Sequence, residues 1–243
     1  MSNGFTFGGV HSDSLGLIVN SKTIPASPPI SNRLQEIGGV DGAWDYGVSY
    51  GPRELEIDVT ILGDTPADTR RSVRKLVGAM NPRKGSQILI FDDEPDIMYY
   101  ARISNQVPLD TLGAMGTFTL QLVCPDPFGY STEIRTATIA RGGTLTHLGT
   151  AEAFPRLSVT HGGGSGSITN RRSDGITETL SFTANSPAGT YIIDSKEKTI
   201  TVGGNRAYNF VKGDFFELPT GDNAVETSGA VSSIAVEYYD TWI

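Results

Sequence analysis

The sequence predicts a mainly β protein, and three observations support that class. The 243 residues include 29 Gly and 13 Pro against 38% apolar residues, short segments alternate apolar and polar side chains, and a single segment has a convincing helical period. Short alternating segments separated by turn residues are typical of β-rich domains rather than helical bundles. A chain of this length forms one large β domain or two ordinary ones, and it buries about 70% of its unfolded surface.

The first strands are expected near the N-terminus. Residues 5–7 and 15–19 have strand-type composition, and residues 55–61 alternate apolar and polar side chains throughout. Such alternation predicts a strand with one buried face. Residues 24–51 are rich in Gly and Pro and show no helical period, so we expect an extended loop or a hairpin arm there.

The expected arm contains three aromatic residues, Trp44, Tyr46 and Tyr50. If the arm is exposed, these rings could anchor a partner, because large aromatic side chains dominate binding interfaces. If the arm folds back, the same rings pack in the core. Arg53, which follows the arm, is a further candidate interface residue.

One helix is predicted from Thr65 onwards. Thr65 supplies a capping hydroxyl, Pro66 suits the first helical position, and Asp68 places an acid in the first turn. The dipeptide Asn81-Pro82 ends the helix, because proline disfavours helical geometry in the residue before it. The apolar repeat consists of Val73, Leu76, Val77 and Met80.

Four cations form the polar flank of this helix, namely Arg70, Arg71, Arg74 and Lys75. A solvated helix face is the simpler interpretation of such a flank. The alternative is a docking patch, in which Arg70 and Arg74 contact a partner.

The densest acidic cluster, Asp92, Asp93, Glu94 and Asp96, follows an apolar strand. Oxygen ligands at this spacing could hold Ca²⁺, but the run lacks the long loop and terminal glutamate of a calcium hand. Asp-Asp-Glu-Pro is good turn chemistry between two strands, so we expect a turn and no metal.

Cys124 is the only cysteine, so no intramolecular disulfide forms, and the three scattered histidines, His11, His147 and His161, give no zinc spacing. As a nucleophile, Cys124 would need His147 or His161 as a base. Its position in an alternating strand instead predicts a small buried residue. No convergent nucleophile, base or metal set emerges, and we expect no catalytic residue and no cofactor.

After Tyr130 the composition changes to Thr, Ser and Gly, and we expect a linker at 136–153 between domains at 1–135 and 154–243. Short alternating segments then recur with turn residues between them, which predicts a β-sandwich. The run 161–167 is Gly-rich but lacks the Gly-Lys-Ser/Thr ending of a phosphate loop, so we expect a flexible hairpin tip. A hairpin loop is expected at 194–198.

The formal net charge is -8, shared as -5 over residues 1–135 and -3 over the remainder. Stable DNA binding requires clustered cations, so DNA capture is not expected, although an acidic surface would let DNA pass without sticking. The N-terminus has no signal-peptide pattern and no segment is long and apolar enough to span a membrane. These features favour synthesis in a cytoplasm.

Motifs in order along most of the chain resemble the distal tail proteins of long-tailed bacteriophages. The strongest block is residues 89–130, with a strand, the acidic turn, a second strand and a third strand that closes on Cys124-Pro125-Asp126-Pro127-Phe128-Gly129-Tyr130. Weaker matches lie at residues 5–9, 15–19, 40–42, 50–53, 74–76, 149–155, 218–223 and 238–242.

The resemblance implies an N-terminal domain related to the tail-tube fold, a β-sandwich with one helix and a long hairpin arm. Copies of this domain would form a hexameric ring around a DNA-conducting channel, with the arm closing the ring. It also implies a C-terminal galectin-like or carbohydrate-module-like β-sandwich outside the ring.

The implied role is structural, at the distal end of the virion tail, after synthesis in the host cytoplasm. The implied partners are further copies of the chain, the tail-tube protein and the baseplate hub, together with the tape-measure and receptor-binding proteins.

Two rival functions remain open. A tail-tube subunit would share the first domain but has less need of the second. A carbohydrate-binding or receptor-binding module would use Tyr191, Tyr208 and Tyr238 of the second domain. Against sugar binding, that domain has neither the His-x-Asn-x-Arg run of galectins nor a Trp platform, since its only Trp is Trp242.

Overall fold

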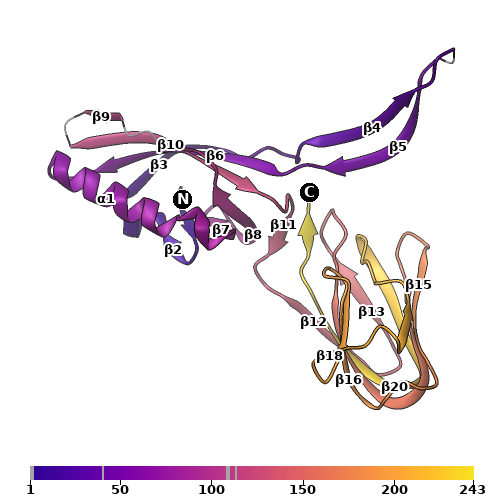
Figure 1. Cartoon of the computed structure of the whole chain (residues 1–243). Helices are drawn as coiled ribbons and strands as arrows, with labels where there is room; N and C mark the ends of the chain where they lie inside the picture. The colour runs from indigo at the N-terminus through magenta and orange to yellow at the C-terminus, as the bar shows by residue number, and fades with distance from the viewer. Residues whose placement is uncertain (1–2, 40, 108–109, 113) are drawn as a thin grey trace. The chain divides into compact units, whose positions relative to one another are not determined.

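The computed structural model describes residues 3–39, 41–107, 110–112 and 114–243 (Figure 1). Its architecture is mainly β, as predicted, with a single α-helix among the described residues. The chain divides into two compact units, unit 1 (Met1–Gly129, with Ile243) and unit 2 (Tyr130–Trp242). Each unit has its own hydrophobic core.

Unit 1 contains an antiparallel sheet in the order β2-β1-β7-β8-β10-β6-β3, and β9 pairs with β10 outside this path. A short 3-10 turn, η1 (Ser12–Leu15), joins β2 to β3. The strands are β1 (Phe5–Phe7), β2 (Val10–His11), β3 (Leu17–Thr23), β6 (Arg53–Leu62), β7 (Gln87–Phe91), β8 (Glu94–Ile103), β9 (Asp110–Leu112) and β10 (Met115–Cys124).

The long ladder between β6 and β10 runs from the pair Arg53–Cys124 to the pair Leu62–Met115. Side chains alternate strictly along both strands, so one face of the ladder is buried and the other is open, as the sequence predicted for β6. Each fully buried Leu or Ile contributes roughly 1.5–3 kcal/mol. The fully buried residues of these two strands are Leu55, Ile57, Val59, Ile61, Leu120, Leu122 and Cys124.

The predicted helix is α1 (Pro66–Ala79). The Thr65 hydroxyl accepts a hydrogen bond from the Asp68 N–H at 3.2 Å, and a 3-10 turn, η2 (Pro82–Lys84), follows the helix. Leu76 and Met80 are buried, whereas Val77 is exposed, because it lies about 100° around the helix from Leu76. No helix in the described part of the chain is both long and apolar enough to cross a bilayer.

The predicted arm is a hairpin of β4 (Ile30–Glu36) and β5 (Ala43–Tyr50), which pair only with each other and form a separate two-stranded sheet. The ladder register shifts between Asn32 and Leu34. On the opposite strand Gly47 has φ 98°, a conformation that favours glycine and allows one extra residue in the strand.

Unit 2 is built around two long strands, β14 (Arg156–Arg171) and β20 (Gly221–Tyr238), in a sheet of order β12-β20-β14-β16-β17-β18. Outside this path, β13 pairs with β20, and β15 pairs with β14 and β19. The other strands of this sheet are β12 (Arg135–Ile139), β13 (Gly142–His147), β15 (Thr177–Phe182), β16 (Gly189–Asp194), β17 (Thr199–Val202), β18 (Asn205–Arg206) and β19 (Val211–Gly213). The short strands β11 (Gly129–Ser131) and β21 (Thr241–Trp242) pair with each other and are not part of it.

The Gly-rich run 161–167 is not the flexible hairpin tip that we expected. It lies inside β14, where the register against β20 shifts on both sides of His161. Gly163 and Gly164 have positive φ values of 94° and 92°, so the glycines bend one long strand instead of reversing the chain. The loop expected at 194–198 does join two paired strands, β16 and β17.

The segment 136–153, expected as a linker, also differs from the prediction. It contains most of β12 and all of β13, which pair with the two halves of β20, and it belongs to unit 2. Its Thr- and Gly-rich composition suggested a linker, but Ile139 and Leu145 fill the core of unit 2. The boundary between the two compact units falls between Gly129 and Tyr130.

Candidate functional site

The hairpin arm is the most exposed apolar surface of unit 1. The Trp44 and Tyr46 side chains are each 61% exposed, and Ile30, Leu34 and Val48 are exposed as well. Aromatic and aliphatic side chains held on a β-hairpin give a preorganised surface for contact with another protein. Trp44 and Tyr46 therefore do not pack in the core of unit 1, which was one of the two alternatives for the arm.

Tyr50, at the base of the arm, is in a different environment. Its ring meets the Phe128 ring edge-to-face, with 5.7 Å between centroids. Such aromatic pairs add roughly 0.5–1.5 kcal/mol beyond the area they bury. Tyr50 therefore helps to fix the base of the arm, whereas Trp44 and Tyr46 are free of the core.

Arg53, expected at an interface, is 2% exposed. Its guanidinium lies 5.6 Å from the centre of the Tyr99 ring, and its Nε and Nη2 atoms have no hydrogen-bond partner among the described residues. Arg53 has the same parity as Leu55 and Ile57 in β6, so the strand directs its side chain to the buried face. The period of the strand could have predicted this inward orientation.

Arg70 and Arg74 are exposed on α1, and they belong to a larger group that we call the basic ridge. One ion pair is formed within it, between Arg71 Nη1 and Asp68 Oδ1 at 3.0 Å. The other ridge cations form no ion pair with any described residue. The ridge consists of Arg70, Arg71, Arg74, Lys75, Arg83 and Lys84, all exposed.

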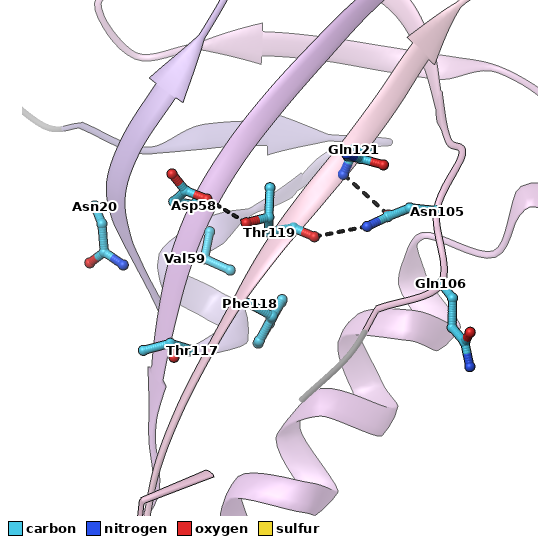
Figure 2. Close-up of a pocket in the computed structure, with 9 residues that line it drawn as sticks. All are labelled: Asn20, Asp58, Val59, Asn105, Gln106, Thr117, Phe118, Thr119 and Gln121. Carbon is cyan, nitrogen blue, oxygen red and sulfur yellow. Dashed lines mark hydrogen bonds between the residues drawn. The ribbon is translucent and has the colours of Figure 1, made fainter. Parts of the chain in front are cut away.

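The open side of the β3-β6-β10 ladder, which we call the polar face, holds a shallow hollow of about 550 Å³ (Figure 2). Asn105 links the wall of the hollow to β10, because its side chain donates to the Thr119 carbonyl at 3.0 Å and accepts from the Gln121 N–H at 3.2 Å. The hollow is lined by Asn20, Asp58, Val59, Asn105, Gln106, Thr117, Phe118, Thr119 and Gln121.

Asp58 is the charged centre of the hollow. The Ser21 hydroxyl donates to its carboxylate at 2.6 Å. The Thr119 hydroxyl donates to the other carboxylate oxygen, and Figure 2 shows this second hydrogen bond. These hydrogen bonds favour the ionised form and lower the pKa of the Asp58 carboxyl. Asp58 therefore stays negatively charged at neutral pH.

Glu54 and Glu56 add two further carboxylates to the polar face. The two cations of these three strands, Lys22 and Arg53, are directed elsewhere: Lys22 pairs with Asp93 and lies over the Phe91 ring. Sequence reasoning missed the polar face, although the outward positions at 54, 56, 58 and 60 in β6 and at 117, 119 and 121 in β10 are all polar. Alternation identifies the buried side of one strand, whereas the residues that share its open side are set by the register of the neighbouring strands.

Asp92 and Asp93 of the acidic cluster form the turn between β7 and β8, as predicted, whereas Glu94 and Asp96 lie within the start of β8. Asp92 accepts a hydrogen bond from the Gly4 N–H at 3.1 Å, and Asp93 pairs with Lys22. Partial burial, followed by the nearby charges of Asp96 and Asp93, raises the pKa of Glu94. Among the described residues, no group of three or more His, Cys, Asp or Glu side chains is placed to hold a metal ion.

Cys124 is fully buried, as predicted. Burial raises the pKa of its thiol to about 12, so almost no thiolate is present at neutral pH. The residue therefore packs as a small apolar side chain.

The tyrosines that favoured a sugar-binding second domain do not form a platform. Tyr191 and Tyr238 are buried, and their hydroxyls donate to the carbonyls of Pro187 and Thr146 at 3.0 and 2.8 Å. Only Tyr208 of the three is exposed. Stacking against a sugar requires exposed ring faces, so this group supports core packing instead.

The main ionic cluster of unit 2 is paired internally. Arg172 Nη1 contacts Glu178 Oε1 and Glu217 Oε2, both at 3.0 Å, and Asn170 donates to the second Glu178 oxygen at 3.1 Å. Hydrogen bonds to charged groups strengthen such a network. The cluster connects β14 and β15 to the segment before β20, which is a structural role.

Comparison with known proteins gives consistent matches for both units. Residues 14–124 match a family model described as a phage tail protein RIFT-related domain, and residues 148–242 match one described as a siphovirus-type tail component, C-terminal domain. The distal tail protein of Bacillus phage SPP1 is 28% identical over 172 residues, which are 69% of this chain and 68% of that protein.

Solved structures share the fold. The crystal structure of SPP1 Dit, described as a paradigm of the hub adsorption apparatus in phages that infect Gram-positive bacteria, matches with a TM-score of 0.82. The match covers 99% of both chains at 19% identity. A chain of the phage P2 baseplate in its activated conformation with Ca matches with a TM-score of 0.53, over 98% of both chains at 8% identity.

A β-rich chain with an exposed hairpin arm and two tail-protein domains is a structural protein of a phage tail. Within that class, the chain belongs to the distal tail protein family of siphovirus-type bacteriophages. It is therefore a component of the virion tail and not an enzyme.

Proposed function

We propose that six copies of this chain assemble into a ring at the distal end of the tail, which joins the tail tube to the baseplate hub and lets DNA pass. Unit 1 forms the ring, and unit 2, which includes residues 136–153, forms a galectin-like domain outside it. The tube protein and the hub are the direct partners, and the tape-measure and receptor-binding proteins are further contacts. The relation to SPP1 Dit, described as part of a hub adsorption apparatus, supports this assignment.

The observation that carries the proposal is the exposed apolar surface of the arm. Seven large apolar side chains between Ile30 and Tyr50 are exposed in a single chain. An apolar surface of this kind on a soluble monomer marks an interaction site. A neighbouring copy that covers the arm would bury these side chains and close the ring.

The polar face suits the wall of a DNA channel. Asp58, Glu54 and Glu56 present carboxylates on this face, and the neighbouring hydroxyl and amide groups are neutral. A surface without clustered cations does not release counterions from DNA and therefore binds it weakly. DNA would slide past such a wall without being held.

The arm is tested by replacing Trp44 and Tyr46 together with Ser. Neither ring packs in the core of unit 1, so the fold should persist, and we expect self-association to weaken by at least about tenfold because two interface anchors are lost. Sedimentation equilibrium measures the association constant, and circular dichroism checks the fold.

Tyr208→Ser is the matched control, because Tyr208 is an exposed aromatic residue of unit 2. It should leave association unchanged. If the double variant associates as strongly as the unmodified protein, the arm is not the contact surface and the proposed ring must close in another way.

A further inference from the structure

The charge of the N-terminal half is strongly segregated. The segment 66–84, which contains α1 and η2, carries six cations and one carboxylate, a net charge of +5. The other residues of 1–135 carry five cations and fifteen carboxylates, a net charge of -10. Charged residues of either sign would keep an exposed helix solvated. The concentration of cations on this one segment of an otherwise acidic domain therefore calls for another explanation.

The basic ridge keeps this charge unpaired within one chain. Arg71 is the only ridge cation with an ion pair among the described residues, and its partner Asp68 lies on the same helix. Val77, on the same helix, is 47% exposed and adds an apolar contact among the cations. Exposed cations around an apolar side chain fit an acidic protein surface that also carries apolar groups.

The arm supplies such a surface near its tip. We define the arm tip by Glu36, Asp41 and Asp45, which are exposed and form no ion pair with any described residue. Arg33 is the only cation between residues 30 and 50, so this part of the arm has a net charge of -2. Trp44 and Asp45 are consecutive in β5 and are both exposed, so their side chains lie on opposite faces of the hairpin.

The two surfaces do not satisfy each other within one chain. No ion pair joins the arm tip to the basic ridge among the described residues, and β4 and β5 pair only with each other. At about 3.3 Å per residue, the seven residues of β4 alone span roughly 20 Å, which exceeds the ~10 Å between packed sheets. The arm is therefore long enough to extend beyond the layer from which it starts.

We propose that the arm tip of one copy docks on the basic ridge of the neighbouring copy. This inference rests on the proposed ring and names the contact that closes it. Two different complementary patches on one chain give a heterologous contact, which repeats around an axis and closes a ring when the rotation is right. The carboxylates of the polar face are less suitable partners, because hydroxyl and amide groups already surround Asp58 and Glu56.

Charge reversal in the full-length protein tests the contact. One variant carries Arg70→Glu with Arg74→Glu, a second carries Glu36→Lys with Asp41→Lys, and a third combines all four. We expect each double variant to associate about tenfold more weakly or worse at low salt, and the combined variant to recover to within about threefold. Arg206→Glu with Lys212→Glu reverses two exposed cations of unit 2 and is the matched control.

A cross-linking measurement identifies the contact directly. Equal amounts of ¹⁴N- and ¹⁵N-labelled protein are mixed in high salt, returned to low salt and treated with a carbodiimide, which joins a carboxylate to an amine as an amide. Mass spectrometry should find mixed-isotope links from Glu36 or Asp41 to Lys75 or Lys84. The mixed isotopes would show that the link joins two copies.

The outcomes separate this contact from the ring itself. If rings form but the combined variant is no better than either double variant, or the links join Glu54 or Glu56 instead, the docking contact is overturned and the ring stands. If ridge reversal abolishes retention of duplex DNA without changing association, the ridge is a DNA surface and the contact is likewise overturned. A protein that stays monomeric in every condition would overturn both proposals.

Discussion

Arg53 and Asp58 lie five residues apart in β6, and their side chains point to opposite faces of the sheet. Odd positions from Arg53 to Ile61 face the core, and the even positions face the open side, so Arg53 is buried while Asp58 remains on the polar face. The buried cation is tolerated through the Tyr99 ring beside it, at 5.6 Å. Residue type alone suggested the reverse, and the strand period decides the orientation.

His147 makes the stability of unit 2 depend on pH. The ring is fully buried, and its Nε2 accepts a hydrogen bond from the Thr241 N–H at 3.0 Å, which requires the neutral form. Burial lowers the pKa of His147 below its ordinary 6.5, although the nearby Asp240 carboxylate opposes this. The folded state therefore binds this proton less readily than the unfolded state.

The stability contribution is complete above about pH 6.5 and is lost as the pH falls from there through the lower pKa of the folded state. We expect the midpoint temperature of thermal unfolding of unit 2 to decrease as the pH is lowered from 7.5 to 5. His147→Gln keeps a hydrogen-bond acceptor but cannot titrate, so it should flatten the dependence of the unfolding midpoint on pH. Other titrating groups are shared by the variant and the unmodified protein, so their effects cancel in the comparison. Parallel profiles for the two proteins would show that His147 is not responsible.

At the scale of single elements, α1 shows how local sequence fixes a boundary. The Thr65 hydroxyl accepts from the Asp68 N–H and donates to the Asp68 carboxylate at 2.7 Å, so the two side chains cap the first turn together. Thr65→Ala should lower the free energy of unfolding of unit 1 by about 1 kcal/mol. Urea titration measures the change, and Thr65→Ser, which retains the hydroxyl, should restore most of it.

The elements that the sequence predicts well are those with local signals. The helix has a cap, a proline and a stop, and the arm has turn residues with no competing period. The misjudged elements depend on long-range pairing: the Gly-rich run looks like a loop until β20 supplies partners for β14 on both sides of it. The Thr-rich segment 136–153 likewise becomes β12 and β13 only because β20 lies beside it.

The candidate surfaces were predictable to different degrees. Trp44, Tyr46, Arg70 and Arg74 could be proposed from composition, because an aromatic arm and a cationic helix flank are visible in the sequence. The exposure of these side chains could not be predicted from composition, because it depends on which surfaces the folded chain leaves uncovered. The polar face could not be predicted without the strand register. The basic ridge could not be recognised without knowing that most of its cations form no ion pair with the described residues.

At the scale of the whole molecule, the chain separates its surfaces by chemistry. Unit 1 has an apolar arm with an acidic tip, a basic ridge on α1 and η2, and an acidic polar face. A chain that acted alone would gain nothing from leaving these surfaces unpaired. Repetition of the chain around an axis would cover the arm, neutralise the ridge and leave the polar face open to a channel.

The most direct test of this account is the mass of the full-length protein in solution. Light scattering across a concentration series, with negative-stain images of the same samples, should give six times the 25.9 kDa chain mass and rings with a central hole. A mass of one chain at every concentration, with no ring in the images, would contradict the account.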